Sequence, residues 1–492
     1  MRGILSYGAY LPHRRLDRST IAAVAGTGGG TGTRTVASYD EDTTTLGVEA
    51  ARRALAATDV VPDALWFSTV EPAYLDKTNA TTVHAALRLP DHVIAADFGG
   101  AVRSAAAALG AALAGGPTAL VVTAGIRTGL PGSADEAQGG DAGAALLVGD
   151  DAAGPVLAEV VGTGSVTDEF LDRWRTPGDL RSKQWEERFG ETRYVPLARA
   201  AVAAALADAG IEADRVDLLV VAGTHARAVR AATRKLGIDP AKVADDLAAT
   251  VGNPGAAQLG LLLSAALDAA VPGQVILALS LADGADAVVL RTTDALADHA
   301  AHAPVAAQVA AGAPVAYGTF LAWRGHLRPE PPRRPEPARP SASAAARNED
   351  WKFGFVGSRD RTSGALHLPP RRAARVGEAV DDMEPAPMAD VGGTIVTYTV
   401  DRLVYSPSPP VVFAMVDFDG GGRAPVELTD LDPADARIGG RVQLTFRRLF
   451  TADGIHNYFW KGRPAADGDP TGPAGPAGPS DGPSTTTTEP EG

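Results

Sequence analysis

The stretch LGVEAARRALAATDVVPDALWFSTVE, residues 46–71, has a counterpart later in the chain, LARAAVAAALADAGIEADRVDLLVVAGTH, residues 197–225. Each stretch has the pattern of an alanine-rich helix, a turn containing Pro or Asp, and a short β-branched strand. Because the unit occurs twice at an interval too long for a solenoid, we expect a duplicated fold with halves at 1–150 and 151–326.

The remaining segments of residues 1–326 alternate in the same way. TALVVTAGIRTG and GDAGAALLVGD, which end the first half, resemble VILALS and GADAVVL near the end of the second. This alternation predicts an α/β sheet with helices on its faces. We expect helices at 45–57, 103–114, 196–209 and 255–270, and strands at 64–70, 118–124, 154–161, 216–222 and 274–280.

Composition divides the rest of the chain. Residues 327–349, rich in Pro, Arg, Ser and Ala, predict an extended linker. Residues 350–463 contain short alternating runs separated by Gly, Pro and Asp, which predicts a small β-barrel or sandwich. Residues 464–492 consist mainly of Pro, Gly, Ser, Thr and Asp, and we expect a disordered tail.

Charge and residue usage exclude several classes of function. The net charge is −14, which argues against a nucleic-acid or anionic-membrane partner because phosphates would be repelled. The chain has no cysteine, so disulfides, thiolate metal sites and cysteine nucleophiles are excluded. The first residues lack the apolar run of a signal peptide, and other apolar stretches are too short to span a bilayer. We therefore expect a cytoplasmic protein.

The repeat places two ionisable residues at equivalent points. Glu71 and His225 each lie just past the carboxyl end of the predicted strand in their half. Open α/β sheets bind their ligands at this edge. The alternatives are an ordinary loop carboxylate and a structural histidine.

The duplicated block resembles the thiolase superfamily, and within it the hydroxymethylglutaryl-CoA synthase and ketoacyl synthase III branch. DFGGAVRSAAAALGAALA (97–114) is similar to the segment in which a nucleophilic cysteine begins a buried helix. The resemblance places the nucleophile at Val102, which cannot attack a carbonyl. It implies a five-layered α/β thiolase fold. Ser104, two positions further on, is an alternative nucleophile only if a base lies beside it.

The same resemblance assigns roles to three residues that the chain retains. Glu71 matches the general acid/base glutamate of the synthases, and His225 matches the catalytic histidine. Asn253, in TVGNPGAAQLG, matches the asparagine that helps to hold the substrate carbonyl, although Asn-Pro also favours a plain turn.

The charged segment 167–190 corresponds to an insertion that helps to cover the CoA entrance in the superfamily. The resemblance implies that Arg175, Arg181 and Lys183 contact CoA phosphates. The alternative is a solvated charged helix. The glycine-rich stretch GTGGGTGT (26–33) lacks the lysine of a P-loop and follows a helical segment, so we expect a loop there.

Residues 350–463 resemble the zinc-ribbon and OB-fold family that accompanies thiolase-like proteins. Two CxxC pairs usually hold the zinc, and the corresponding residues are Asp360 with Ser363 and Ala374 with Gly377. Closed zinc sites need four strong ligands. We therefore expect a barrel without zinc and no other cofactor.

Two functions follow from the resemblance. The first is carbon–carbon bond chemistry on an acyl-CoA or acyl-carrier-protein thioester without an acyl-enzyme: aldol, retro-aldol or decarboxylative. The second is a non-catalytic acyl-CoA-binding scaffold that partners an active thiolase-like subunit. A homodimer or a complex with another thiolase-like subunit is implied by resemblance alone.

Overall fold

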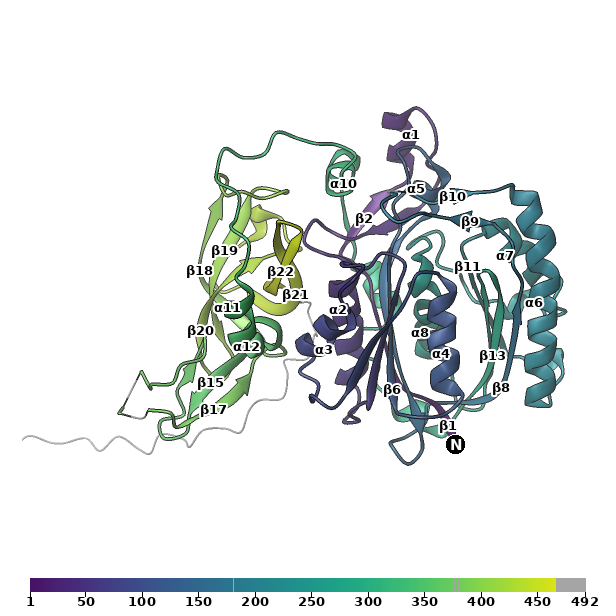
Figure 1. The fold of residues 1–492 in the computed structure, drawn as a ribbon, viewed down its shortest axis with the longest axis horizontal. Coiled ribbons are helices and arrows are strands. Elements are labelled where there is room, and N and C mark those ends of the chain that lie inside the picture. Colours follow the sequence, from purple (N-terminus) through teal and green to yellow (C-terminus); the bar gives the residue numbers. More distant parts are fainter. Residues whose placement is uncertain (180, 376, 379, 466–492) are drawn as a thin grey trace, which may run out of the picture. The chain divides into compact units, whose positions relative to one another are not determined.

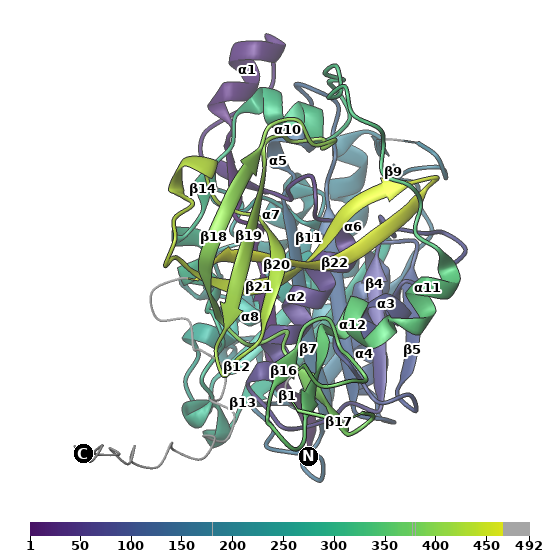
Figure 2. The same cartoon turned by 90° about the vertical axis from the view of Figure 1, so that its left-hand side faces the viewer.

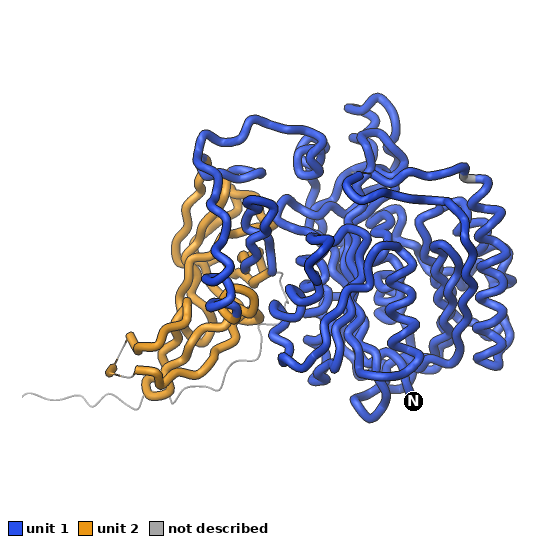
Figure 3. Tube along the Cα trace, in the orientation of Figure 1, with its two compact units in different colours: residues 1–349, 403–409, 446–459 blue, residues 350–402, 410–445, 460–492 orange. Residues whose placement is uncertain are grey.

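The protein's computed structural model describes residues 1–179, 181–375, 377–378 and 380–465. They divide into two units, which Figure 3 shows in different colours. Unit 1 comprises residues 1–349, 403–409 and 446–459, and the other described residues form unit 2. The predicted disordered tail lies outside the described residues, except for Pro464 and Ala465.

The large sheet of unit 1 contains, among the described residues, nine strands in the order β11-β12-β13-β8-β1-β7-β6-β4-β5. Their bounds are β1 (Arg2–Tyr10), β4 (Ala64–Thr69), β5 (Ile94–Gly99), β6 (Ala119–Ile126), β7 (Asp141–Asp150), β8 (Ala158–Thr167), β11 (Leu218–Gly223), β12 (Val275–Leu281) and β13 (Gly284–Thr292). The predicted strand at 154–161 is therefore shifted, because β8 begins only at Ala158.

The two halves of this sheet repeat one pattern of pairing. β4 is parallel to β6, and β6 and β1 are both antiparallel to β7. In the second half β11 is parallel to β12, and β12 and β8 are both antiparallel to β13. The halves meet where β1 pairs with β8 through Gly3 and Ile4. The duplication inferred from the sequence is thus present in the sheet.

The helices of unit 1 complete five layers. They include α2 (Thr43–Ala56), α3 (Ala80–Ala86), α4 (Arg103–Leu113), α6 (Glu187–Ala209), α7 (Ala226–Thr233) and α8 (Gln258–Ala269). α2 packs on β1, β6 and β7, and α6 packs on β8 and β13. α4 and α8 contact strands of both halves and lie between them, as Figure 1 shows. The order of layers is therefore helix, sheet, helix, sheet, helix.

Smaller elements surround these layers. They are α1 (Ser19–Ala25), α5 (Ala134–Gln138), α9 (Val305–Ala310), α10 (Tyr317–Trp323), α11 (Ala342–Arg347), the strands β2 (Arg14–Asp17), β3 (Thr33–Val36) and β14 (Ala313–Pro314), and the pair β9 (Arg173–Trp174) and β10 (Lys183–Gln184). α11 lies in the predicted extended linker, where Ser341 caps an alanine-rich run by accepting a hydrogen bond from the Ala344 amide.

Unit 2 contains a small three-stranded sheet and most of a closed barrel. α12 (Glu349–Gly354) leads into β15 (Val356–Asp360), which pairs with β16 (Leu366–His367) and β17 (Met383–Pro387). The barrel is formed by β18 (Gly393–Asp401), β19 (Val411–Phe418), β20 (Arg423–Leu428), β21 (Arg441–Ala452) and β22 (Ile455–Pro464). Its strands can be followed in Figure 2. Residues 446–459, the end of the β21–β22 hairpin, belong to unit 1.

Glycine allows the outer helices to approach the sheet at equivalent points of the two halves. A Cβ on Gly8 of β1 would lie 2.5 Å from the Ala54 nitrogen of α2. A Cβ on Gly164 of β8 would lie 2.2 Å from the Ala201 carbonyl oxygen of α6. Because these neighbours are backbone atoms, they cannot give way by changing rotamer.

We predict that Gly164→Ala lowers the free energy of unfolding by about 1–3 kcal/mol, because α6 must move away from β8. Gly110→Ala is the matched control. Nothing lies within 4 Å of its added Cβ, and it lies inside α4. We expect this control to gain about 0.5–1 kcal/mol from helix propensity. Urea unfolding measures both, and equal stability of the two variants would contradict the close approach.

Candidate functional site

Glu71 follows β4 and is held by contacts on both its main chain and its side chain. Its carboxylate accepts a hydrogen bond from Arg175 Nη1 at 2.6 Å, and Arg175 Nη2 donates to the Val70 carbonyl oxygen at 2.6 Å. Its own carbonyl oxygen accepts from the Thr43 hydroxyl at 2.6 Å. Burial raises the pKa of Glu71, and the positive charge of Arg175 opposes this rise. The carboxylate is therefore a stronger base than a solvent-exposed glutamate.

The loop after Glu71 is also held by the end of the β21–β22 hairpin. The Tyr74 hydroxyl accepts from the His456 backbone nitrogen at 2.8 Å, and the two rings lie 5.2 Å apart. Tyr458 donates to Asp42 Oδ2 at 2.8 Å, while Asp42 Oδ1 caps the first turn of α2. α2 carries Thr43, which binds the Glu71 carbonyl. The end of the β21–β22 hairpin thus supports the Glu71 loop directly, through Tyr74, and indirectly, through Asp42 and α2.

His225 caps α7 and is buried. Its Nδ1 accepts a hydrogen bond from the Ala228 amide at 3.0 Å, so a neutral ring carries its proton on Nε2. Nε2 lies 3.9 Å from Asp172 Oδ1, which is too far for a hydrogen bond, and it has no partner among the described residues. Gly190 lies against it, since an added Cβ would come within 2.5 Å of Nε2.

Asp172 is the carboxylate that faces this histidine. Burial raises the pKa of Asp172, while His225 and the hydroxyl of Tyr194 oppose the rise. Tyr194 donates to Asp172 Oδ2 at 3.3 Å.

Asn253 lies in a network at the end of β11. Its Nδ2 donates to the Gly223 carbonyl oxygen at 2.8 Å and to Gln258 Oε1 at 2.7 Å. Its Oδ1 accepts from the Gly255 amide at 2.8 Å. Both amide hydrogens are thus used within the protein. Holding a substrate carbonyl, as the sequence predicts, requires that one of these bonds be replaced.

Val102 is the N-cap residue of α4, and Gly255 lies beside it. A Cβ on Gly255 would lie 3.9 Å from Val102 Cγ2. Ser104 donates its hydroxyl hydrogen to the Gly99 carbonyl oxygen at 2.9 Å. A base that activates Ser104 is therefore not evident among the described residues, and this hydroxyl serves the backbone of the preceding turn.

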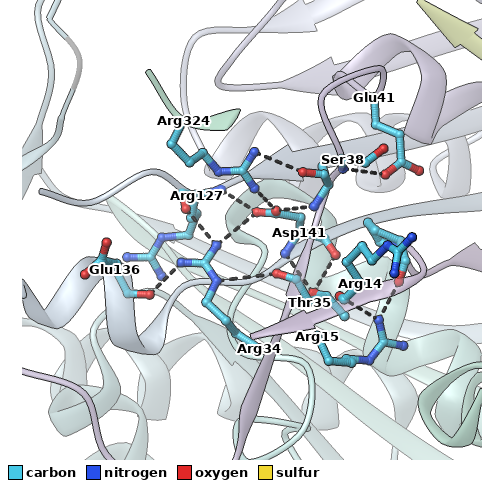
Figure 4. Close-up of polar contacts among 12 residues, drawn as sticks. Arg14, Arg15, Arg34, Thr35, Ser38, Glu41, Arg127, Glu136, Asp141 and Arg324 are labelled. Atoms are coloured by element: carbon cyan, nitrogen blue, oxygen red, sulfur yellow. Dashed lines mark hydrogen bonds and ion pairs between the residues drawn. The ribbon is translucent and has the colours of Figure 1, made fainter. Parts of the chain in front are cut away.

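Arginine side chains surround this region. Arg127 Nη2 donates to Asp135 Oδ1 at 2.7 Å. Arg173 also binds Asp135, through Nη1 at 2.9 Å and Nη2 at 2.5 Å. Deeper in unit 1, Arg34 and Arg324 converge on Asp141, as Figure 4 shows. Pairs of guanidinium groups therefore share single carboxylates.

A short segment joins the two predicted acid/base residues. Asp172 faces His225 and Arg175 binds Glu71. Asp172 and Arg175 are three residues apart, so their Cα atoms are at most about 11 Å apart. The segment thus brings the ends of β4 and β11 to one region. No motif or repeat pointed to Asp172, and Arg175 was predicted as a phosphate ligand.

The other predicted ligands lie elsewhere on the same insertion. Lys183 belongs to β10, which is antiparallel to β9, and it lies opposite Trp174. Lys183 is exposed. Arg181 is also exposed. Their contact with CoA phosphates stays a prediction.

In the ribbon-like part of unit 2, Asp360 accepts hydrogen bonds from the Thr362 and Ser363 amides and from the Ser363 hydroxyl. It is buried beside His367. Within the described residues, no three His, Asp or Glu side chains gather as ligands of a metal ion.

Among all the residues that the structure describes, no helix is both long and apolar enough to cross a bilayer.

Two family models match the chain. The C-terminal domain of 3-oxoacyl-[acyl-carrier-protein] synthase III matches residues 206–292, and the ChsH2 C-terminal OB-fold domain matches residues 386–447. The hydroxymethylglutaryl-CoA synthase of Picrophilus torridus is 31% identical over 328 residues, which cover 62% of this chain and 91% of the relative.

Solved structures give the same fold. MvaS in complex with 3-hydroxy-3-methylglutaryl coenzyme A matches this chain with a TM-score of 0.55 and 21% identity. The match covers 69% of this chain and 94% of MvaS. The 3-oxoacyl-[acyl-carrier-protein] synthase III of Aquifex aeolicus has a TM-score of 0.51, 20% identity, and coverage of 59% and 100%. The predicted thiolase-like α/β fold followed by an OB-fold is confirmed.

We predict that Tyr458→Phe loosens the Glu71 loop, because Asp42 loses a hydrogen bond. The expected loss of stability is about 1 kcal/mol. Amide hydrogen exchange in residues 70–79 should quicken. Tyr398→Phe, which removes the hydroxyl of an exposed tyrosine, is the control. Unchanged exchange in the Tyr458 variant would show that the hairpin does not support this loop.

Proposed function

Since the chain belongs to the hydroxymethylglutaryl-CoA synthase family, we propose that it catalyses carbon–carbon bond chemistry on an acyl-CoA thioester without an acyl-enzyme. The proposal is supported most directly by Glu71, a buried carboxylate of raised pKa at the carboxyl end of β4, in a chain that has no cysteine. With Val102 at the predicted nucleophile position, covalent transfer is not available, whereas proton abstraction is.

The proposed step begins with the ionised Glu71 carboxylate. It takes a proton from the carbon next to the thioester carbonyl, and the electron pair of that C–H bond forms the enolate. The enolate then attacks the carbonyl of a second acyl group, a C–C bond forms, and the resulting alkoxide takes up a proton. The reverse sequence is retro-aldol cleavage, and loss of CO₂ from a β-carboxyl group produces the same enolate.

Arg175 is assigned to control this base. Its charge opposes the effect of burial and keeps Glu71 ionised over a wider pH range. His225, with Asp172 behind it, is assigned to protonate the oxygen on which negative charge develops. Asn253 can assist only after giving up one of its two present acceptors.

A second candidate function is a non-catalytic acyl-CoA-binding scaffold that works with an active thiolase-like subunit. It is favoured by the engagement of both Asn253 amide hydrogens within the protein. The two candidates differ in whether the purified chain alone turns over a thioester.

We predict that Glu71→Gln slows the incorporation of solvent deuterium next to the thioester carbonyl of acetyl-CoA by about 10²–10⁴-fold, the usual contribution of a general base. Mass spectrometry of the recovered acetyl-CoA measures this incorporation. Glu212→Gln, a change at an exposed glutamate, is the control. Exchange that is equally fast in the Glu71 variant would remove the proposed base, and absence of exchange in the unaltered protein would favour the scaffold.

The same exchange should depend on pH through the ionisation of Glu71. Only the carboxylate form accepts a proton, so the rate rises as pH increases through the pKa of Glu71. Arg175→Gln removes a charge that lowers this pKa, so the rise should move to higher pH. Arg215→Gln, a change at an exposed arginine to which no role is assigned, should leave the profile in place. A profile shifted to lower pH by Arg175→Gln would contradict the assigned role.

A further inference from the structure

The first turns of α6 lie directly against the imidazole of His225. A Cβ on Gly190 would lie 2.5 Å from His225 Nε2, 2.6 Å from its Cδ2 and 3.0 Å from Asp172 Oδ1. Nε2 is buried and has no hydrogen-bond partner among the described residues. An oxygen of a bound thioester therefore cannot reach Nε2 while Gly190 occupies this place.

The arrangement leaves a polar hydrogen of His225 unused. Because Nδ1 accepts from the Ala228 amide, the neutral ring carries its proton on Nε2. A buried donor without an acceptor has lost its hydrogen bond to water and received none in return. Movement of Gly190 away from the ring would let water or a substrate oxygen accept from Nε2. This gain favours a helix end that can move.

α6 is anchored unequally on the two sides of Pro196, which lies inside the helix. Beyond Pro196 the helix packs on β8 and β13, as Figure 1 shows, and Ala198, Ala201 and Ala205 are completely buried. Before it, Gly190 is the only buried residue in the range 188–193. Proline has no N–H to donate within a helix, and helices bend at such positions. Pro196 is therefore placed as a hinge.

Two ion pairs connect residues 188–193 to their surroundings. Glu191 pairs with Arg227 of α7, and Arg193 pairs with Asp168. The four side chains are between 30% and 43% exposed. Ion pairs that water reaches contribute little to stability. Breaking them therefore opposes the movement of this segment only weakly.

Tyr194 is buried but lies near the hinge. Its hydroxyl donates to Asp172 Oδ2 and accepts from the Asp283 amide, both at 3.3 Å, which is long for a hydroxyl. Gly190 is six residues from Pro196, or about 9 Å along the helix. A tilt at Pro196 thus moves Gly190 much further than Tyr194.

We propose that residues 188–193 form a hinged cover over His225, which opens at Pro196 when a thioester binds. The inference rests on the proposed function, because a thioester oxygen is the acceptor that takes the place of Gly190 at Nε2. Asp172 and Arg175 belong to the preceding segment and keep their contacts. The apparent affinity for the thioester is then lowered in proportion to the closed fraction of the protein.

Two substitutions are expected to act on the cover in opposite directions. Gly190→Ala places a methyl group against Nε2 and disfavours the closed position, although alanine suits a helix better than glycine. Pro196→Ala restores the missing N–H and favours the continuous helix. Gly110→Ala in α4, where nothing lies within 4 Å of the added Cβ, is the control for helix propensity.

Amide hydrogen exchange of the full-length protein measures the opening, because two helical turns without packing fray readily. Exchange in residues 188–193 should quicken in Gly190→Ala and slow in Pro196→Ala. Exchange in residues 198–209 should stay unchanged in Gly190→Ala, which places the bend at Pro196. Saturating acetyl-CoA should quicken exchange in residues 188–193 of the unaltered protein, whereas a ligand that closes a site slows it.

Titration calorimetry with acetyl-CoA gives an independent readout. Pro196→Ala should weaken binding about tenfold, since the closed helix gains one hydrogen bond. Gly190→Ala should bind acetyl-CoA at least as tightly as the unaltered protein does.

The outcomes separate this inference from the function on which it rests. Exchange in residues 188–193 that is no faster in Gly190→Ala, or that slows when acetyl-CoA binds, overturns the cover and leaves the proposed function standing. Failure of acetyl-CoA to bind overturns the proposed function and the thioester as the trigger, and the ligand-free exchange still decides whether the cover is hinged. If Gly190→Ala does not fold, Pro196→Ala and the effect of acetyl-CoA on the unaltered protein decide.

Discussion

The carboxylate of Asp141 organises the interior of unit 1 around the candidate site. It accepts hydrogen bonds from the backbone nitrogens of Ala37 and Arg127 and from the side chains of Arg34 and Arg324. Arg34 lies in β3 and Ala37 directly follows it, while Arg127 directly follows β6 and Arg324 directly follows α10. A buried carboxylate so placed is strongly stabilising only with all its partners, since removing one side of a buried ion pair leaves an uncompensated charge.

This constraint suits a site that works by charge and position and has no thiolate. Glu71 is buried enough to be a good base, and Arg175 keeps it from being protonated too readily. The same short segment presents Asp172 to His225. Val102, at the position that the sequence predicts for a nucleophile, is the N-cap residue of α4 and has an apolar side chain. In the function that we propose, the remaining chemistry is the removal and return of protons beside a thioester.

The sequence predicted the features that repeat or lie at the ends of regular elements. The duplication could be predicted from the sequence because each half has the same helix, turn and strand pattern. The two halves of the sheet repeat the same strand pairing. Glu71 and His225 were predicted as site residues because they follow equivalent strands. The partner of Arg175 could not be predicted, because Glu71 lies 104 residues away and both residues are individually ordinary. The support of Tyr74 by His456 was equally inaccessible, since it joins segments 382 residues apart. A charged residue in a loop has many possible partners, and which one it contacts is determined by the tertiary structure.

The proposed chemistry requires a thioester to lie beside Glu71. A crystal structure with a stable acetyl-CoA analogue, in which a methylene group replaces the thioester sulfur, tests this directly. We predict that the carbon next to the analogue's carbonyl lies about 3–3.5 Å from a Glu71 carboxylate oxygen, with its acetyl group against Val102. An acetyl group that ends in another part of unit 1, or that is separated from Glu71 by other side chains, would contradict the account.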